Sequence, residues 1–458
     1  MRSSRRIGAG VRAGVVGTLV ATVVAIVVFG AGQAAADGAF PDSNSLYVPS
    51  DRPHEIVLGT NFGLVITEDD GQTWHLVCEQ AVASKVLGYQ VSAPPNDTIY
   101  AATTTGVGRS TDNGCSWSFA GGALAGANVA DIFPDAVDPN ELFAIAYPPI
   151  ADGGLPEGGV FHSTDGALTF SDTPLYAATS AQSLTGVEKA RSGGRDLYLT
   201  LYSYPPLQPT LAHFNAGGTF DLHDQSVALM GWQPYLAAVD PVDSNVLYLR
   251  LRAVTEALGI SRDGGQTIAN VFPIAGHMSA FLRRANGTLL MGSSDRASLR
   301  STDNGQTFPI WGDAPHVRAL AERDGVLYVA ADNLRDGFAV ASSTDEGKHW
   351  TPLLHFYDIQ GPPTCGNLPA ICAGPWAAFQ AMFPPPQPDA GVADLATDAP
   401  APPPSPPSGR GRGCSIDASA TPAGLLVSLL LVGALLSSRS GRVQRVLRAF
   451  QTGRGDGK

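Results

Sequence analysis

The sequence is poor in charged residues, methionine and cysteine, and rich in glycine and proline. Charged residues make up 15% of its 458 positions, methionine and cysteine occur five times each, and there are 52 glycines and 35 prolines. Acidic residues outnumber basic ones, and the net charge is -12. Because nucleic acids and anionic membrane surfaces require a basic surface, this composition argues against both as binding partners.

Motifs of catalysis and metal binding are also missing. No Cys-x-x-Cys pair occurs and the nine histidines are scattered, so no metal site and no cofactor are expected. The sequence has no Gly-x-Ser-x-Gly elbow, phosphate-binding loop or zincin helix. No helix-length periodic segment occurs between residues 40 and 360, which favours an all-β fold.

A repeated eight-residue motif dominates that stretch. It reads hydroxyl residue, x, Asp, x, Gly, x, Thr or Ser, aromatic, and it occurs at residues 67–74, 110–117 and 301–308, and at 343–350 with His349 in the Thr or Ser position. Degenerate copies lie at 163–170, where Ala167 replaces the glycine, at 261–268, which lacks the aromatic residue, and at 213–220, where Asn215 replaces Asp. The copies start 40 to 53 residues apart, a spacing that predicts a stacked-repeat architecture.

Each copy follows a short apolar run bounded by turn residues, as β-strands do. The runs are residues 55–59, 98–102, 141–145, 196–200, 246–250, 288–292 and 326–330. With about four strands in each repeat, seven repeats predict a seven-bladed β-propeller of four-stranded blades over residues 37–360.

The acidic residue of each motif is expected to fasten a turn between two strands. Its carboxylate can accept backbone N–H bonds, the glycine supplies a positive φ, and the Thr or Ser hydroxyl can close the same loop. The residues assigned this structural role are Asp69, Asp112, Asp165, Asn215, Asp263, Asp303 and Asp345. A ring of metal or glycan sites is the alternative, but one such residue per blade leaves the carboxylates far apart.

The motif resembles the Asp-box, or bacterial neuraminidase repeat, over about residues 40 to 360. That repeat occurs in sialidases, sortilin-type receptors, xyloglucan-degrading enzymes and photosystem assembly factors. The resemblance implies a propeller, whereas function has to be argued from sites. Xyloglucan-degrading enzymes of this family use two facing propellers, and this chain has repeats for one.

Sialidase chemistry would require an arginine triad, a Tyr nucleophile with a Glu partner, an acidic Asp and an Arg-Ile-Pro motif near the first blade. Residues 46–53 stand where that motif is expected and do not contain it, and sialidases usually have six blades. The arginines available for a triad are Arg52, Arg109, Arg250, Arg252 and Arg318, which we interpret as surface or strand-end residues.

Both ends of the sequence indicate export. Arginines precede an apolar run at residues 15–29, and three alanines end at Ala36, which predicts a signal peptide over 1–36 cleaved before Asp37. A retained membrane anchor is the alternative. After an extension with two cysteines at 361–383, residues 384–413 form a Pro/Ala-rich linker that is expected to be disordered.

Residues 414–458 contain Cys414, a short apolar stretch and a basic tail. Together with the linker they resemble the myxobacterial C-terminal sorting signal. The resemblance implies that the tail is removed and that Cys414 holds the protein at the outer surface, although a second Cys, frequent in that family, is replaced by Ser415. An uncleaved tail helix is the alternative. Both predict a protein anchored to a membrane at the cell surface or outer membrane.

Export permits disulfide bonds. A local bridge between Cys365 and Cys372 is predicted in the extension, and a bridge between Cys78 and Cys115 is predicted to join the first two blades. For the second pair, two separate buried thiols are the alternative.

Aromatic loops offer the best candidate contacts. Tyr147, Tyr202 and Tyr204 follow the same strand in the third and fourth repeats, so both loops are expected on one face, where exposed tyrosines are common contact residues. Ordinary long hairpins are the alternative. The sequence therefore predicts a non-catalytic binding or scaffold protein for an unidentified protein or glycan, with a sialidase-like or other carbohydrate-active hydrolase as the alternative.

Overall fold

The computed structural model describes residues 41–148, 157–215, 218–295 and 297–385. All of them belong to one of the two units of the chain, Met1–Gln387. The predicted signal peptide, its cleavage between Ala36 and Asp37, the sorting residue Cys414 and the linker beyond residue 385 lie outside the described residues.

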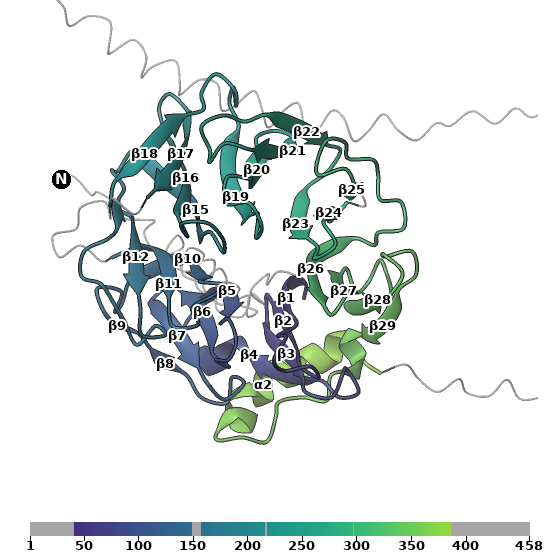
Figure 1. Ribbon diagram of the computed structural model, residues 1–458. Coiled ribbons are helices and arrows are strands. Elements are labelled where there is room, and N and C mark those ends of the chain that lie inside the picture. The colour runs from purple at the N-terminus through teal and green to yellow at the C-terminus, as the bar shows by residue number, and fades with distance from the viewer. Residues whose placement is uncertain (1–40, 149–156, 216–217, 296, 386–458) are drawn as a thin grey trace, which may run out of the picture. The chain divides into compact units, whose positions relative to one another are not determined.

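Seven antiparallel sheets follow one another around a ring (Figure 1). Blade 1 contains β1 (Ser43–Tyr47), β2 (Ile56–Thr60), β3 (Gly63–Thr67) and β4 (His75–Cys78). Blade 2 contains β5 (Val86–Val91), β6 (Ile99–Thr103), β7 (Gly106–Ser110) and β8 (Ser118–Phe119). Blade 3 contains β10 (Asn128–Pro134), β11 (Leu142–Tyr147), β12 (Gly159–Ser163) and β14 (Tyr176–Ala177).

The remaining blades have the same consecutive strand order. Blade 4 contains β15 (Gln182–Lys189), β16 (Leu197–Ser203), β17 (Gln208–Phe214) and β18 (Phe220–Asp224). Blade 5 contains β19 (Gln233–Val239), β20 (Leu247–Arg252), β21 (Glu256–Ser261) and β22 (Asn270–Ile274). Blade 6 contains β23 (Met278–Arg283), β24 (Leu289–Ser293) and β25 (Leu299–Ser301), and blade 7 contains β26 (Val317–Arg323), β27 (Val326–Ala331), β28 (Val340–Ser343) and β29 (Thr351–Leu354).

The predicted seven-bladed all-β propeller is therefore confirmed. One detail differs, because blade 6 has three strands and a single bridge from Leu299 to Ile310 where the other blades have a fourth strand. Outside the blades, β9 (Gly121–Gly122) and β13 (Thr169–Phe170) form a short parallel pair that links blades 2 and 3.

The core consists of layers between blades. The middle strands are buried on both faces; all five residues of β2 and of β3 are buried. This explains why they read as continuous apolar runs rather than alternating ones. The described residues form seven apolar clusters, one at each junction between neighbouring blades. Each blade thus buries apolar side chains against both of its neighbours.

The ring closes without exchanging a strand between the chain ends. Blade 1 uses only N-terminal strands and blade 7 only its own four. Instead, the chain returns over blade 1 after a 3₁₀ turn at Phe356–Asp358, pairing with the outer strand β4. Gln360 N donates to Trp74 O and Leu76 N donates to Gly361 O, both over 2.9 Å.

A helix then completes this return. Helix α2 (Leu368–Met382) packs on blade 1 (Figure 1). The ring of Phe379 lies 4.8 Å from that of Phe62, between centroids, and Phe379 and Phe383 cover the apolar cluster between blades 7 and 1. Among the helices that the structure describes, none is long and apolar enough to cross a membrane.

Two disulfides fix the returning segment to the first two blades. Cys372 bonds to Cys78 and Cys365 bonds to Cys115, with Cα–Cα distances of 5.6 and 5.7 Å. All four cysteines are therefore disulfide-bonded, but the predicted pairs Cys365–Cys372 and Cys78–Cys115 are wrong. The physical reason is the return of the chain, which places each cysteine of the extension against a different blade. We call residues 356–383, with these two disulfides, the clasp.

The Cys78–Cys372 bond should make a large contribution to stability. Because it closes a loop of 294 residues, replacing both cysteines by alanine should lower the free energy of unfolding by roughly 2–5 kcal/mol. Urea denaturation of the double variant and the wild type measures the difference. Peptide mapping without reductant is the control, and a peptide joining Cys365 to Cys372 would contradict the observed pairing.

Candidate functional site

The repeated motifs, called boxes below, form the turns between the third and fourth strands of the blades. In the first, Thr67 Oγ1 donates to Asp69 Oδ1 over 2.8 Å and accepts from Gly71 N over 3.0 Å. Thr73 donates from N to Oδ1 and from Oγ1 to Oδ2 of Asp69 over 2.9 and 2.7 Å. Both carboxylate oxygens are thus engaged by the turn itself.

Four other boxes repeat this geometry, at Asp112, Asp165, Asp263 and Asp303, and in the box at Asp345 the imidazole of His349 replaces the second hydroxyl. Burial acts to raise the pKa of Asp112, but hydrogen bonds from Ser116 and Ser110 outweigh it and lower that pKa. Asn215 occupies the equivalent turn between β17 and β18, whose residues 216–217 lie outside the described part of the chain. The boxes therefore stabilise turns, and each of them lies on a separate blade.

The box aromatic residue and glycine face the preceding blade. Trp74 Nε1 donates to Leu353 O of blade 7 over 3.0 Å. Gly347 has a φ of 76°, and a Cβ built there would lie 2.4 Å from the Trp311 ring of blade 6. Each box therefore joins its blade to the previous one.

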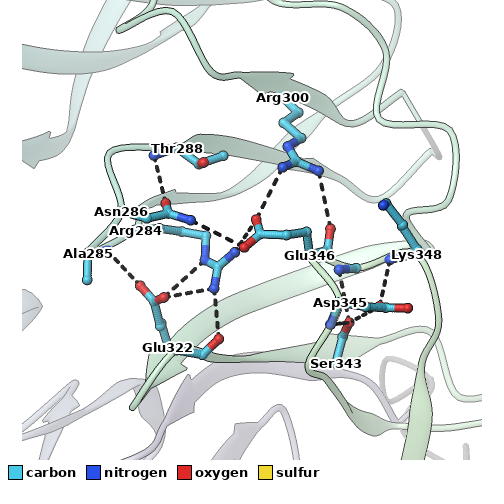
Figure 2. A network of polar contacts seen from close by, with 12 residues as sticks. Arg284, Ala285, Asn286, Thr288, Arg300, Glu322, Ser343, Asp345, Glu346 and Lys348 are labelled. Carbon is cyan, nitrogen blue, oxygen red and sulfur yellow. Dashed lines mark hydrogen bonds and ion pairs between the residues drawn. The ribbon is translucent and has the colours of Figure 1, made fainter.

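Ion pairs of arginine residues also connect neighbouring blades. Figure 2 shows buried Arg284 of blade 6 donating from Nε and Nη2 to Glu322 Oε1 of blade 7 over 3.1 and 2.9 Å. It also bonds to Glu346 of the seventh box, which Arg300 contacts over 3.2 Å. Both charges lose hydration when such an ion pair is buried, and directed hydrogen bonds take the place of water. Because these bonds require a defined geometry, they fix the orientation of blade 7 relative to blade 6.

The five arginines considered for a sialidase triad lie on four different blades. Arg52 bonds to Asp97 of blade 2, Arg109 to Gly166 O of blade 3, Arg250 to Glu256, and Arg318 to Asp42 and Asp332. Arg252 is exposed. Four of the five thus have internal partners, and the structure does not bring the set together.

The antiparallel strand order gives the ring two distinct faces. Loops from the first to the second strand and the boxes open on one side, called the box face. Hairpins from the second to the third strand and the links between blades open on the other, called the hairpin face.

The structure places all three candidate tyrosines on the hairpin face. Tyr147 of blade 3 and Tyr202 of blade 4 come close to each other. Burial raises the pKa of Tyr147, and the charge of Tyr202 raises it further. Tyr204 exposes 67% of its surface. Residues 149–156 of the first loop lie outside the described residues.

Sequence reasoning missed three apolar residues on the same face. Val227 and Met230 lie in the link between blades 4 and 5, and Val254 lies at the tip of the β20–β21 hairpin. Each exposes 82% or more of its surface. Single apolar residues in loops have no periodicity, so only their exposure reveals them.

A pocket of about 400 Å³ lies at the box-face mouth of the central channel. Five blades contribute to its lining, which combines apolar side chains and prolines with a few polar groups. The polar and charged residues include Tyr47, Gln90, Asp135, Arg191 and Glu322. We call this cavity the channel-mouth pocket. Its residues are far apart in the sequence, so no local motif could have indicated it.

Two carboxyl groups on the inner strands were also missed. Burial raises the pKa of Glu188 on β15 to about 7 and that of Asp131 on β10 to about 6. Glu188 Oε2 accepts a hydrogen bond from Val239 N of blade 5 over 3.0 Å. Among the described residues, no group of three or more His, Cys, Asp or Glu side chains is arranged to hold a metal ion.

No family model matches the chain. No curated protein matches it either. Among solved structures, it is similar to the GH74 enzyme of Niastella koreensis, with 12% identity, a TM-score of 0.39, and coverage of 68% of this chain and 65% of that one. It is also similar to YCF48 bound to a D1 peptide, with 14% identity, a TM-score of 0.40, and coverage of 63% and 89%.

A third similar structure is the extracellular domain of a hybrid two-component system from B. thetaiotaomicron, with 10% identity and a TM-score of 0.47. It is covered over 38% of its length, and this chain over 68%. The chain thus spans less than two thirds of the GH74 enzyme and of this domain. At these identities and TM-scores, no function transfers from any of the three proteins.

The structural role of the boxes can be tested at Asp112. Replacement by alanine should lower the free energy of unfolding by about 1–2 kcal/mol, because Ser110 and Ser116 lose their acceptor. Asp112→Asn should cost less, since one acceptor oxygen remains. Urea denaturation measures both variants, and unchanged stability of Asp112→Ala would contradict a fastening role.

Glu188 should make stability depend on pH. Its pKa is raised in the folded protein, from about 4.5 to about 7, so stability is lost as pH rises through that window. Above pH 7, Glu188→Gln should therefore be more stable than the wild type by roughly 3 kcal/mol, at about 1.4 kcal/mol per pKa unit. Below pH 4.5 the two should be equal. Denaturation between pH 4 and 8.5 tests this, with exposed Glu157→Gln as the control.

Proposed function

We propose that this chain is an exported, surface-attached propeller that acts as a non-catalytic binding protein. The observation that carries the proposal is the exposure of aromatic and apolar side chains on the hairpin face of neighbouring blades. Tyr204 of blade 4 is exposed there, as are Met230 and Val254, and the half-buried Tyr202 lies beside Tyr204 in the chain. Large exposed apolar groups on one face of a soluble domain are typical of contact surfaces.

Export is supported by the two disulfides, because such bonds form and persist in oxidising compartments. The signal peptide over residues 1–36 and membrane attachment through Cys414 and the basic tail complete this proposal. The partner is a protein or glycan at the cell surface. A basic nucleic-acid-binding surface does not fit the acidic composition.

A carbohydrate-active hydrolase is the second candidate. It is favoured by the raised pKa of Glu188, because a carboxyl group that is protonated near pH 7 can serve as a general acid. A panel of chromogenic glycosides separates the two functions. Turnover that Glu188→Gln abolishes would favour the hydrolase, whereas specific binding without turnover would favour the binding protein.

Loss of Tyr202 and Tyr204 should weaken binding but not folding. A glycan array and a panel of purified surface proteins identify a ligand, and titration calorimetry then measures its affinity. Replacing Tyr202 and Tyr204 by alanine should raise the Kd by about 10–100-fold, as for contact residues worth about 1–3 kcal/mol. Phe119→Ala is the matched control, because Phe119 is an exposed aromatic on the outer strand of blade 2. Unfolding of the tyrosine variant would mean that these residues are structural.

A further inference from the structure

The channel-mouth pocket contains three charged residues, and two of them are already neutralised. Asp135 forms an ion pair with Arg195 over 2.6 Å and also accepts from Val137 N and Asp138 N. Both oxygens of the carboxylate are therefore occupied. Neither oxygen needs a ligand to complete its hydrogen bonding.

Glu322 is saturated in the same way. Its Oε1 accepts two hydrogen bonds from Arg284, and its Oε2 accepts from Ala285 N over 2.8 Å, as Figure 2 shows. This carboxylate belongs to the network between blades 6 and 7. Its charge is balanced by a buried guanidinium rather than left to act on the pocket.

Arg191 is different. It lies in the loop between β15 and β16, is exposed, and makes no hydrogen bond or ion pair with the described residues. It lies near enough to Glu188 to act on its charge. Among the charged residues that line the pocket, its guanidinium alone retains all of its donors.

Gln90 adds a second donor. Its Oε1 accepts from Tyr47 Oη over 3.0 Å, which leaves its amide N–H groups without a partner among the described residues. Arg191 and Gln90 therefore offer the pocket donors, while the acceptor oxygens of its two carboxylates are taken. An apolar part of the wall includes Pro49, Val91 and Pro94.

We propose that the channel-mouth pocket binds a small carboxylic acid with an apolar body. The carboxylate would pair with Arg191, whose planar fork matches its two oxygens, and the apolar body would contact the proline and valine wall. The volume of about 400 Å³ lies within the range of small-molecule sites, about 300–1,000 Å³. This site is on the box face and does not depend on the tyrosines of the hairpin face.

Titration calorimetry of the folded propeller with benzoate tests the proposal. Benzoate should bind, whereas benzyl alcohol and benzylamine, which have the same ring without a carboxylate, should bind at least 10-fold more weakly. Glucuronate, a carboxylate on a polar body, should also bind more weakly than benzoate. Equal binding of benzylamine would overturn the anion preference, and stronger binding of glucuronate would overturn the apolar body.

Variants of Arg191 test whether its guanidinium binds the carboxylate. Arg191→Ala should weaken benzoate binding by about 10–100-fold, and Arg191→Lys should retain part of it. Arg252→Ala is the matched control, because Arg252 is also exposed but lies on blade 5 outside the pocket. An unchanged melting temperature shows that the variants are folded. Benzoate affinity that is unaffected by Arg191→Ala, or equally reduced by Arg252→Ala, would overturn the site.

Discussion

Every blade of this propeller buries both of its faces against a neighbour, and the last such contact must be made between the two ends of the chain. Six junctions join blades that are consecutive in sequence, whereas the junction of blades 7 and 1 closes a ring over about 300 residues. Loop closure over that length carries an entropic cost. The clasp helps to offset this cost. Its helix covers the apolar cluster of that junction, and its disulfides bond to blades 1 and 2.

The need to join neighbouring blades also explains the role of many charged residues. Arg284, Arg323 and Arg52 all bond across a junction, to carboxylates or carbonyl groups of the next blade. In a protein with few charged residues, many of the cations are therefore structural. Exposed side chains without an internal partner are therefore the best candidates for ligand contact, and Arg191 and Tyr204 are two of them.

Much of the fold could be predicted because it depends on local interactions. A box combines a hydroxyl, an Asp or Asn side chain and a glycine within eight positions, so the pattern can be recognised even in the degenerate copy at Asn215. The candidate site was harder to predict. Tyr202 and Tyr204 could be placed on a loop, but Val254, Met230 and Arg191 follow no pattern in the sequence.

The sequence by itself determined the number of blades, the turns that connect their outer strands and the tyrosine loops, because each of these is encoded within one repeat. Only the tertiary structure decided which cysteines pair and which side chains meet at the channel mouth. The reason is that both depend on contacts between distant repeats. Cys372 meets Cys78 across 294 residues only because the chain returns over the first blade, and Arg191 shares a pocket with Gln90 only because the ring closes.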